Sequence, residues 1–363
     1  MVTESMPSPR AETSTAADAD AFHAYARGIK TAVDARLVSF LEQRVTWAAT
    51  LGADVGVVLD AYRALAVRGG KRLRAVLLAA SYEACGGEGG GRAVTDAGVS
   101  LELLQAYLLV HDDWMDGDDT RRGGPSAHAL LRERFGSNSE GDTGAILAGD
   151  YGAAIALEIL AAMPVAAPRL LAAIRELARV QGDVVIGQII DVRGAAQTRA
   201  QVEAMHRLKT ASYTVRAPFL IGAALAGASS ELTEGLSGAA DPLGIAFQLR
   251  DDLLGSFGDP TLTGKSARGD LREGKRTALI VELEGDREAD RLLPRVLGVA
   301  DAPQEEVDAL LKRMVDSGAK ARVEARLGAL LDEARTRLAR LPLSAEGKAV
   351  LFGAVSALGS RET

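Results

Sequence analysis

Apolar residues recur every three to four positions along most of this 363-residue chain. That spacing places them on one face of an α-helix. Runs that alternate apolar and polar residues, as half-buried strands do, are hard to find. Helix-breaking segments separate the periodic stretches, at 86–91, at 123–125 and at 258–274. The sequence therefore predicts an all-α protein built as a single large helical bundle.

The expected helices follow directly from this periodicity. Residues 22–51 predict one long helix or two, and residues 288–358 predict four shorter amphipathic helices. The other predicted helices cover 54–66, 72–84, 101–115, 126–135, 142–163, 169–192, 201–226 and 242–255.

The chain shows no sign of a linker between domains. Its length alone would suggest about two domains at ~150 residues each, but no stretch rich in proline and serine marks a boundary. Residues 1–20 are polar and aperiodic, which predicts a disordered N-terminal tail. We therefore expect one domain over residues 21–363.

Several classes of protein are disfavoured by composition. The net charge is −7, from 49 acidic and 42 basic residues, whereas nucleic-acid binders usually carry a basic surplus. A single cysteine, Cys85, excludes an intrachain disulfide, and four scattered histidines do not suggest zinc. No apolar run reaches the ~18 residues of a membrane span, and the start lacks a secretory h-region. We expect a cytoplasmic protein with no transmembrane segment.

Five carboxylates stand in eight positions at the end of the apolar helix 101–115, at Asp112, Asp113, Asp116, Asp118 and Asp119. Asp112 lies four residues after Leu108, so it continues the buried stripe, and Asp116 and Gln105 share that face. Two carboxylates ~6 Å apart repel by about 3 kcal/mol at an effective dielectric of ~20. A bound divalent cation would remove this penalty, and oxygen ligands alone favour Mg²⁺.

A second acidic pair, Asp251-Asp252, also ends an apolar helix, one turn after Gln248. Asp259 and Asp270 follow in the aperiodic segment. Such a pair is weak evidence by itself. Together with the first cluster, it predicts two helices that face one cavity and share metal ions.

Lysine is scarce, with eight residues among 42 basic ones, and half of the lysines lie near these clusters: Lys71, Lys209, Lys265 and Lys275. Gly69 to Arg74 places three cations at a helix start, where backbone N–H groups also favour anions. Carboxylates that hold Mg²⁺, beside lysines and arginines, indicate a site for a diphosphate. No Walker-type phosphate loop is present.

These motifs resemble those of the trans-isoprenyl diphosphate synthases, the polyprenyl synthetase family that makes farnesyl and geranylgeranyl diphosphate. The similarity runs from about Phe22 onward, with the family's motifs in order: GGKRLR (69–74), LLQAYLLVHDDWMDGDDTRRGGPS (103–126), GQIID (187–191), KT (209–210), FQLRDDLLGSFGDPTLTGKS (247–266) and GDLREGKRT (269–277). The resemblance implies the isoprenoid synthase fold, in which helices surround a central cavity, with residues 21–363 as the catalytic domain.

The resemblance also implies a role for each matched position. The implied metal ligands are Asp112, Asp113, Asp116, Asp251 and Asp252. The implied contacts to the allylic diphosphate are Arg121, Lys209 and Lys265, with Lys275 close by. The implied pocket for isopentenyl diphosphate contains Lys71, Arg74, Gln105 and Arg122. Thr210, Gln248, Gln188 and Asp191 match positions around the reacting centre.

The implied reaction is a Mg²⁺-dependent condensation of isopentenyl diphosphate with a dimethylallyl, geranyl or farnesyl diphosphate. Three Mg²⁺ ions are implied, with Mn²⁺ as an alternative, and the family usually forms homodimers. Tyr107 and Leu108, five and four positions before Asp112, are the implied determinants of chain length. One aromatic residue there, without a second beside it, favours geranylgeranyl diphosphate, with farnesyl diphosphate next.

Two positions depart from the family pattern. Gly255 replaces the usual third aspartate of the second motif, and Trp114 stands between the aspartates of the first, where we expect it to pack against the bundle. Two alternatives stay open. One is a class I terpene cyclase that acts on a single prenyl diphosphate, although Gly255 stands where its metal motif needs serine or threonine. The other is a regulatory subunit of a heteromeric synthase, although such subunits tend to lose the metal carboxylates.

Overall fold

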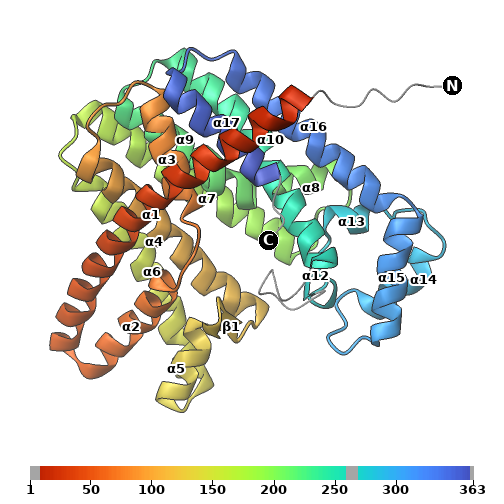
Figure 1. The fold of residues 1–363 in the computed structure, drawn as a ribbon. Coiled ribbons are helices and arrows are strands. Elements are labelled where there is room, and N and C mark those ends of the chain that lie inside the picture. The colour runs from red at the N-terminus through yellow and green to blue at the C-terminus, as the bar shows by residue number, and fades with distance from the viewer. Residues whose placement is uncertain (1–8, 259–268, 360–363) are drawn as a thin grey trace.

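The computed structural model describes residues 9–258 and 269–359, and nearly all of them are helical (Figure 1). The prediction of an all-α protein is confirmed. The first half of the chain forms α1 (Pro9–Leu51), α2 (Ala53–Val67), α3 (Leu73–Ala84), α4 (Gly91–Asp116), α5 (Ala127–Phe135), α6 (Asn138–Ala161) and α7 (Ala167–Val192).

The second half continues the bundle. Its elements are α8 (Arg199–His206), the π-helix η1 (Arg207–Arg216), α9 (Ala217–Ala226), α10 (Ser230–Phe257), α12 (Gly269–Arg272), α13 (Ala278–Val281), α14 (Ala289–Val296), α15 (Gln304–Asp316), α16 (Ala319–Ala339) and α17 (Ala345–Gly359). The four C-terminal helices match the four predicted from the amphipathic pattern.

Helix α1 differs from the prediction at its start. We expected disorder through residue 20, but the helix already begins at Pro9 and runs unbroken to Leu51. Alanine is frequent in this segment and favours helix, and proline is tolerated in a first turn because its missing N–H group would have no partner there. The polar composition that suggested a tail therefore belongs to a helical extension from residue 9 onward.

Two other elements depart from the periodic pattern. Helix α10 starts at Ser230, twelve residues before the prediction, and Pro242 lies inside it. The Ser229 hydroxyl accepts a hydrogen bond from the Leu232 N–H group and so caps the helix. The predicted helix 201–226 is divided, because residues 207–216 adopt π-helical geometry between α8 and α9.

A short hairpin follows α4, formed by β1 (Thr120–Arg121) and β2 (Gly124–Pro125). Its two turn residues, Arg122 and Gly123, both have left-handed backbone conformations, with φ of 52° and 72°. Tight two-residue turns of this kind need positive φ at both positions, which glycine supplies easily and arginine does not. The hairpin was not predicted, because strands of two residues leave no periodic signal.

The helices that carry the first cluster lie in the core. Helix α4 packs against α6, and the Tyr62 hydroxyl of α2 donates a 2.7 Å hydrogen bond to the Leu103 carbonyl. A Cβ atom on Gly152 of α6 would lie 2.3 Å from the Tyr62 ring, so only glycine allows this approach. Helices α4 and α6 are both long and apolar enough to cross a membrane by length and composition. Core packing accounts for most of that composition in α4, whereas α6 also exposes Leu147 and Leu157.

The site elements converge from distant parts of the chain. Helix η1 packs against both α7 and α10, and α3 packs against α4 and α9. Helices α14 and α15 project to the side away from α2 and α5 (Figure 1). The ends of α4, α7 and α10, together with η1, therefore supply most of the polar side chains described next.

Candidate active site

The end of α4 presents Asp112 and Asp116, one turn apart. Asp112 accepts a 3.1 Å hydrogen bond from Gln188 Nε2 and lies 3.7 Å from Lys209 Nζ. Asp116 accepts a 3.0 Å hydrogen bond from Lys275 Nζ. Burial, followed by the neighbouring Asp112, raises the pKa of Asp116, although Lys275 opposes the rise. Both carboxylates are thus partly buried acids that need a cation beside them.

Asp113 has a different partner from Asp112 and Asp116. Its side chain is fully buried, and its Oδ1 atom accepts a 2.6 Å hydrogen bond from Arg121 Nε. The same guanidinium donates a 2.9 Å hydrogen bond to Asp118. Burial raises the pKa of Asp113 to about 6, and Arg121 limits the rise. Three aspartates of this motif were predicted as metal ligands. In this structure Asp113 binds Arg121 of the hairpin, whereas Asp112 and Asp116 pair with lysines.

Lys209 of η1 lies between two acids. Its ammonium pairs with Asp191 of α7 and with Asp112 of α4. Burial would lower the pKa of Lys209, but the two carboxylates outweigh it and raise the value, so the side chain is charged. Gln188 and Asp191 come from the same face of α7, so the predicted residues of three elements meet here.

In the second acidic pair, as in the first, one aspartate is buried and the other is more accessible. Asp252 is buried and accepts hydrogen bonds from Gln248 Nε2 at 2.9 Å and from the Ala278 N–H group at 3.4 Å. Gln248 in turn accepts a 2.7 Å hydrogen bond from Thr210. Asp251 is less buried than its neighbour. Asp252 therefore anchors a chain of hydrogen bonds to η1, which leaves Asp251 as the more accessible acid.

His206 lies against this network, and sequence reasoning missed it. Its Nε2 atom is 3.5 Å from Asp252 Oδ2. Burial lowers the pKa of His206 to about 4 and raises that of Asp252 to about 6. Near neutral pH the histidine is therefore uncharged and the aspartate is mainly ionised. In the sequence, His206 is a single histidine without a motif around it, so nothing predicted its contact with Asp252.

Lys275 connects the two halves of the site. It follows α12, yet its ammonium reaches Asp116 at the end of α4 and also pairs with Glu273. Burial would lower the pKa of Lys275, but Asp116 and Glu273 outweigh that effect and raise it. The predicted site residue Lys265 and the neighbouring acid Asp259 lie outside the described residues.

The loop at the start of α3 carries the other group of predicted cations. Lys71 is exposed, while Arg74 donates a 2.7 Å hydrogen bond to Thr214 and its guanidinium lies 4.3 Å from the centre of the Tyr213 ring. Gln105 is buried on α4, and its Oε1 atom has no hydrogen-bond partner among the residues that the structure describes. An unpartnered polar atom in a buried position is costly and is typical of a binding site.

Arg72, between Lys71 and Arg74, is buried and has a structural task that the motif alone did not reveal. It donates a 2.6 Å hydrogen bond to Asp34, a 3.1 Å bond to Glu102 and a 3.0 Å bond to the Ala66 carbonyl. The signal available in the sequence was Glu102, a charged residue inside an apolar helix. Arg72 therefore ties the loop to α1 and α4.

The donor set suits a hard divalent cation bound together with a diphosphate. Among residues 9–258 and 269–359, no three histidine, cysteine or acidic side chains converge as a ready-made metal cage. Mg²⁺ is usually held by one or two carboxylates together with substrate phosphates and water, so such a cage is not required. Asp112, Asp116 and Asp251 are oxygen ligands of the kind it prefers, and two of them are now neutralised by lysines.

Trp114 contacts α6. Its indole is 36% exposed, and hydrogen bonds from Arg132 and then Trp114 lower the pKa of Asp142. The residue thus has a partner on the protein surface.

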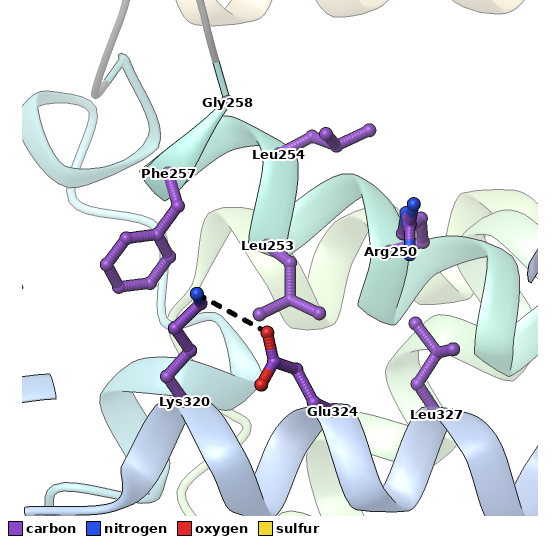
Figure 2. Close-up of a pocket in the computed structure, with 8 residues that line it drawn as sticks. All are labelled: Arg250, Leu253, Leu254, Phe257, Gly258, Lys320, Glu324 and Leu327. Carbon is purple, nitrogen blue, oxygen red and sulfur yellow. Dashed lines mark ion pairs between the residues drawn. The ribbon is translucent and has the colours of Figure 1, made fainter. Parts of the chain in front are cut away.

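A pocket of about 380 Å³ lies near the second cluster but outside the site. Figure 2 shows it between α10 and α16, lined by Leu253, Leu254, Phe257 and Leu327 and crossed by the Lys320–Glu324 ion pair. None of the clustered aspartates lines it. It is therefore distinct from the diphosphate site predicted from the motifs.

The sequence matches a family model described as polyprenyl synthetase over residues 56–314. The chain is 35% identical over 295 residues to a geranylfarnesyl diphosphate synthase of Aeropyrum pernix, covering 78% of this chain and 87% of that protein. It is 33% identical to a geranylgeranyl diphosphate synthase of Methanosarcina mazei, covering 77% of this chain and 82% of that one.

Solved structures agree. The fold is similar to that of a geranylgeranyl pyrophosphate synthase from Corynebacterium glutamicum, crystallised with isoprenyl diphosphate and magnesium, with a TM-score of 0.85. The two sequences are 31% identical, and the match covers 92% of this chain and 99% of the other. The chain therefore belongs to the polyprenyl synthetase family and is a prenyltransferase, as its motifs predicted.

Proposed function

We propose that this chain condenses isopentenyl diphosphate with an allylic diphosphate to give a short all-trans product. Geranylgeranyl diphosphate is the favoured product and farnesyl diphosphate the next. The observation that carries the proposal is the meeting of Asp112 and Asp116 with Lys209 and Lys275, which come from separate elements. Buried acids paired with movable ammonium groups are suited to exchange those partners for a metal and a diphosphate.

On the allylic side, the protein supplies positive charge where negative charge develops. Lys209, Lys275 and Arg121 lie around the first cluster, and we propose that they hold the diphosphate as its bond to the allylic carbon breaks. Thr210 and Gln248, joined by a hydrogen bond, face the reacting centre in this proposal. The departing diphosphate takes the proton lost after the new carbon–carbon bond forms.

We propose Mg²⁺ as the cofactor, held by Asp112, Asp116 and Asp251, with three ions in the full complex and Mn²⁺ as an alternative. When bound, the metal supplies positive charge that stabilises the departing diphosphate. The Corynebacterium glutamicum structure is a complex with magnesium, and that of a polyprenyl synthase from Caulobacter crescentus is a complex with calcium. Asp113 and Asp252, predicted as ligands, are proposed instead to position their neighbours, because both are buried and hydrogen-bonded inward.

On the other side, Lys71, Arg74, Gln105 and Arg122 are proposed to bind isopentenyl diphosphate. The unpartnered Gln105 oxygen and the exposed Lys71 ammonium support this assignment. A terpene cyclase has no use for such a second anion site. A regulatory subunit would not need the paired carboxylates.

Chain length is proposed to depend on Tyr107, which lies about 7.5 Å before Asp112 along α4 at 1.5 Å per residue. Its ring packs edge-to-face on His111, with centroids 5.0 Å apart. The His111 ring fits against Gly149 of α6, where a Cβ atom would lie 2.3 Å from Nε2. Leu108 packs beside Tyr107 in the same core. Relatives of this chain are named as synthases of farnesyl, geranylgeranyl and geranylfarnesyl diphosphate, which differ in product length.

Gly255 has a packing explanation for its departure from the family pattern. A Cβ atom there would lie 2.2 Å from Asp270 Oδ2, so the Asp270 carboxylate occupies the space in which a third aspartate would begin. We propose that the second motif works without a side chain at position 255.

A homodimer is also proposed, through α7. Helix α7 carries several exposed apolar residues: Leu171, Val185, Ile186, Ile189 and Val192. Their exposures run from 46% to 60%, although large apolar patches are unusual on monomers. A second copy of the same helix would cover them with two-fold symmetry.

We further propose a cytoplasmic location, in keeping with a free Cys85. Fractionation of cells that express the tagged chain would test it.

The purified chain, incubated with labelled isopentenyl diphosphate, an allylic primer and Mg²⁺, should release geranylgeranyl diphosphate. Chromatography of the dephosphorylated product identifies it. Failure with every primer would favour the regulatory subunit, and hydrocarbon from a prenyl diphosphate alone would favour the cyclase. Chelation of divalent ions should abolish the product.

Tyr107→Ala should lengthen the product by at least one isoprene unit, because loss of the ring opens space below the first cluster. The matched control Tyr107→Phe keeps the ring and should keep the product length. An unchanged distribution in Tyr107→Ala would show that chain length is set elsewhere.

Gly255→Ala should lower the melting temperature relative to Gly328→Ala, because its methyl group meets Asp270 and overpacking of about 1–3 kcal/mol offsets the gain of about 1 kcal/mol in helix propensity. Gly328→Ala in α16 is the control, since nothing lies within 4 Å of its Cβ position. That change should stabilise by about 1 kcal/mol through helix propensity. Equal melting shifts in the two variants would contradict the packing explanation.

Ile189→Glu should convert the proposed dimer to a monomer, because a charge on the α7 face opposes its burial. Sedimentation velocity measures the mass. Val315→Glu, at a residue of α15 that is 52% exposed, should leave the mass unchanged. A monomeric wild-type chain would refute the dimer.

A further inference from the structure

Two arginines join the loop before α3 (residues 68–72) to the β1–β2 hairpin. Each arginine donates hydrogen bonds to backbone carbonyls of the other segment. Arg68 Nη1 donates hydrogen bonds to the carbonyl oxygens of Arg121 at 2.9 Å and Pro125 at 2.8 Å. In return, Arg122 Nη1 donates a 3.0 Å hydrogen bond to the Gly69 carbonyl and a longer 3.4 Å bond to that of Arg68. We call this reciprocal contact of Arg68 and Arg122 the arginine clasp.

A glycine makes room for the Arg68 guanidinium. A Cβ atom on Gly124 would lie 2.7 Å from Arg68 Cζ, which is closer than side chains tolerate. Gly70 is needed for its backbone instead, because its φ of 131° favours glycine, and a Cβ atom there would make an ordinary 3.6 Å contact with Arg122 Nη1. The hairpin sequence is therefore fitted to Arg68 at Gly124.

Each clasped segment is also anchored on its own. Arg72 holds the loop to Asp34 and Glu102, and Arg121 holds the hairpin to Asp113. Arg72 and Arg122 are the non-glycine residues with positive φ in the described part of the chain. Such conformations are strained and persist only where the surroundings impose them. The clasp thus joins two pieces that are fixed separately.

We propose that Arg68 is a positioning residue that sets the isopentenyl diphosphate site against the allylic site. This inference rests on the proposed function. The Arg68 guanidinium binds two carbonyl groups of the hairpin backbone. It therefore acts indirectly, because it holds the hairpin turn that carries Arg122 next to the loop that carries Lys71. Without the Arg68 side chain, the turn and the loop lose two of the four hydrogen bonds between them, and only those of Arg122 to the loop carbonyls remain to hold Arg122 and Lys71 on one anion.

The two substrates should respond differently to loss of the clasp. Arg121 keeps its bonds to Asp113 and Asp118, which do not involve Arg68. Arg122 has no comparable anchor to an acid among the described residues, since its hydrogen bonds go to loop carbonyls. The affinity for isopentenyl diphosphate should therefore fall, while that for the allylic substrate is largely kept.

The test compares Arg68→Ala, Arg68→Lys and Gly124→Ala with the wild-type chain. In Arg68→Ala, KM for isopentenyl diphosphate should rise roughly tenfold, the loss expected for one or two hydrogen bonds. KM for the allylic substrate should change less than about twofold. Arg68→Lys should fall between, because one ammonium cannot reproduce the fork that spans two carbonyls. Gly124→Ala should act like Arg68→Ala by displacing the guanidinium.

Combining the two changes gives a stricter test. Once Arg68 is removed, the methyl group of Gly124→Ala has nothing to displace, so the double variant should match Arg68→Ala. Additive effects, equal rises in both KM values, or a fall in kcat alone would overturn the proposal.

Arg63→Ala is the matched control. It lies on α2, shortly before the clasp residue, and pairs with Asp60 on the surface. Its kinetics should equal those of the wild type, and a matching KM rise in this variant would also overturn the proposal. An inactive wild-type chain would refute the proposed function instead. Circular dichroism verifies folding, and if Arg68→Ala fails to fold, Arg68→Lys and Gly124→Ala decide.

Discussion

The structure depends on how the carboxylates at the end of α4 are neutralised. Asp112 and Asp116 lie one turn apart, at a helix terminus whose dipole also disfavours negative charge. The counter-charges come from far along the chain, with Lys209 on η1 and Lys275 after α12. The same ion pairs that neutralise the acids therefore join α4 to the other half of the bundle.

In each aspartate pair, the two neighbouring residues have different environments. Asp113 and Asp252 are buried and bind Arg121 and Gln248, while Asp112 and Asp251 are more accessible. Helical geometry explains the division, because successive residues point about 100° apart. A double aspartate at a helix end therefore provides one more accessible side chain and one buried side chain that is hydrogen-bonded inward. This separates the residues that would meet a metal from those that hold the arginine and the glutamine in place.

The sequence predicted what is local or periodic. The apolar stripe of α4 placed Asp112 and Asp116 together, and motif order identified Lys209, Lys275 and Arg74. It could not predict contacts whose partners carry no pattern. Arg68 binds backbone carbonyls, which every residue has, and Arg72 binds Asp34, 38 positions away. The hairpin is too short for periodicity, and the helical start of α1 lacks the apolar stripe by which helices are recognised.

The π-helix η1 has a consequence for which changes this chain tolerates. A π-helix fits more residues into each turn than an α-helix does, so α8 and α9 are rotated relative to a continuous α-helix. Lys209 and Thr210 both lie within it, and they reach Asp191 and Gln248 from that altered register. Loss of a single residue from 207–216 would relax the segment toward α-helix and turn both side chains aside. A substitution at 207–216 changes one side chain and keeps this register, whereas a one-residue deletion would disconnect η1 from α7 and α10 together.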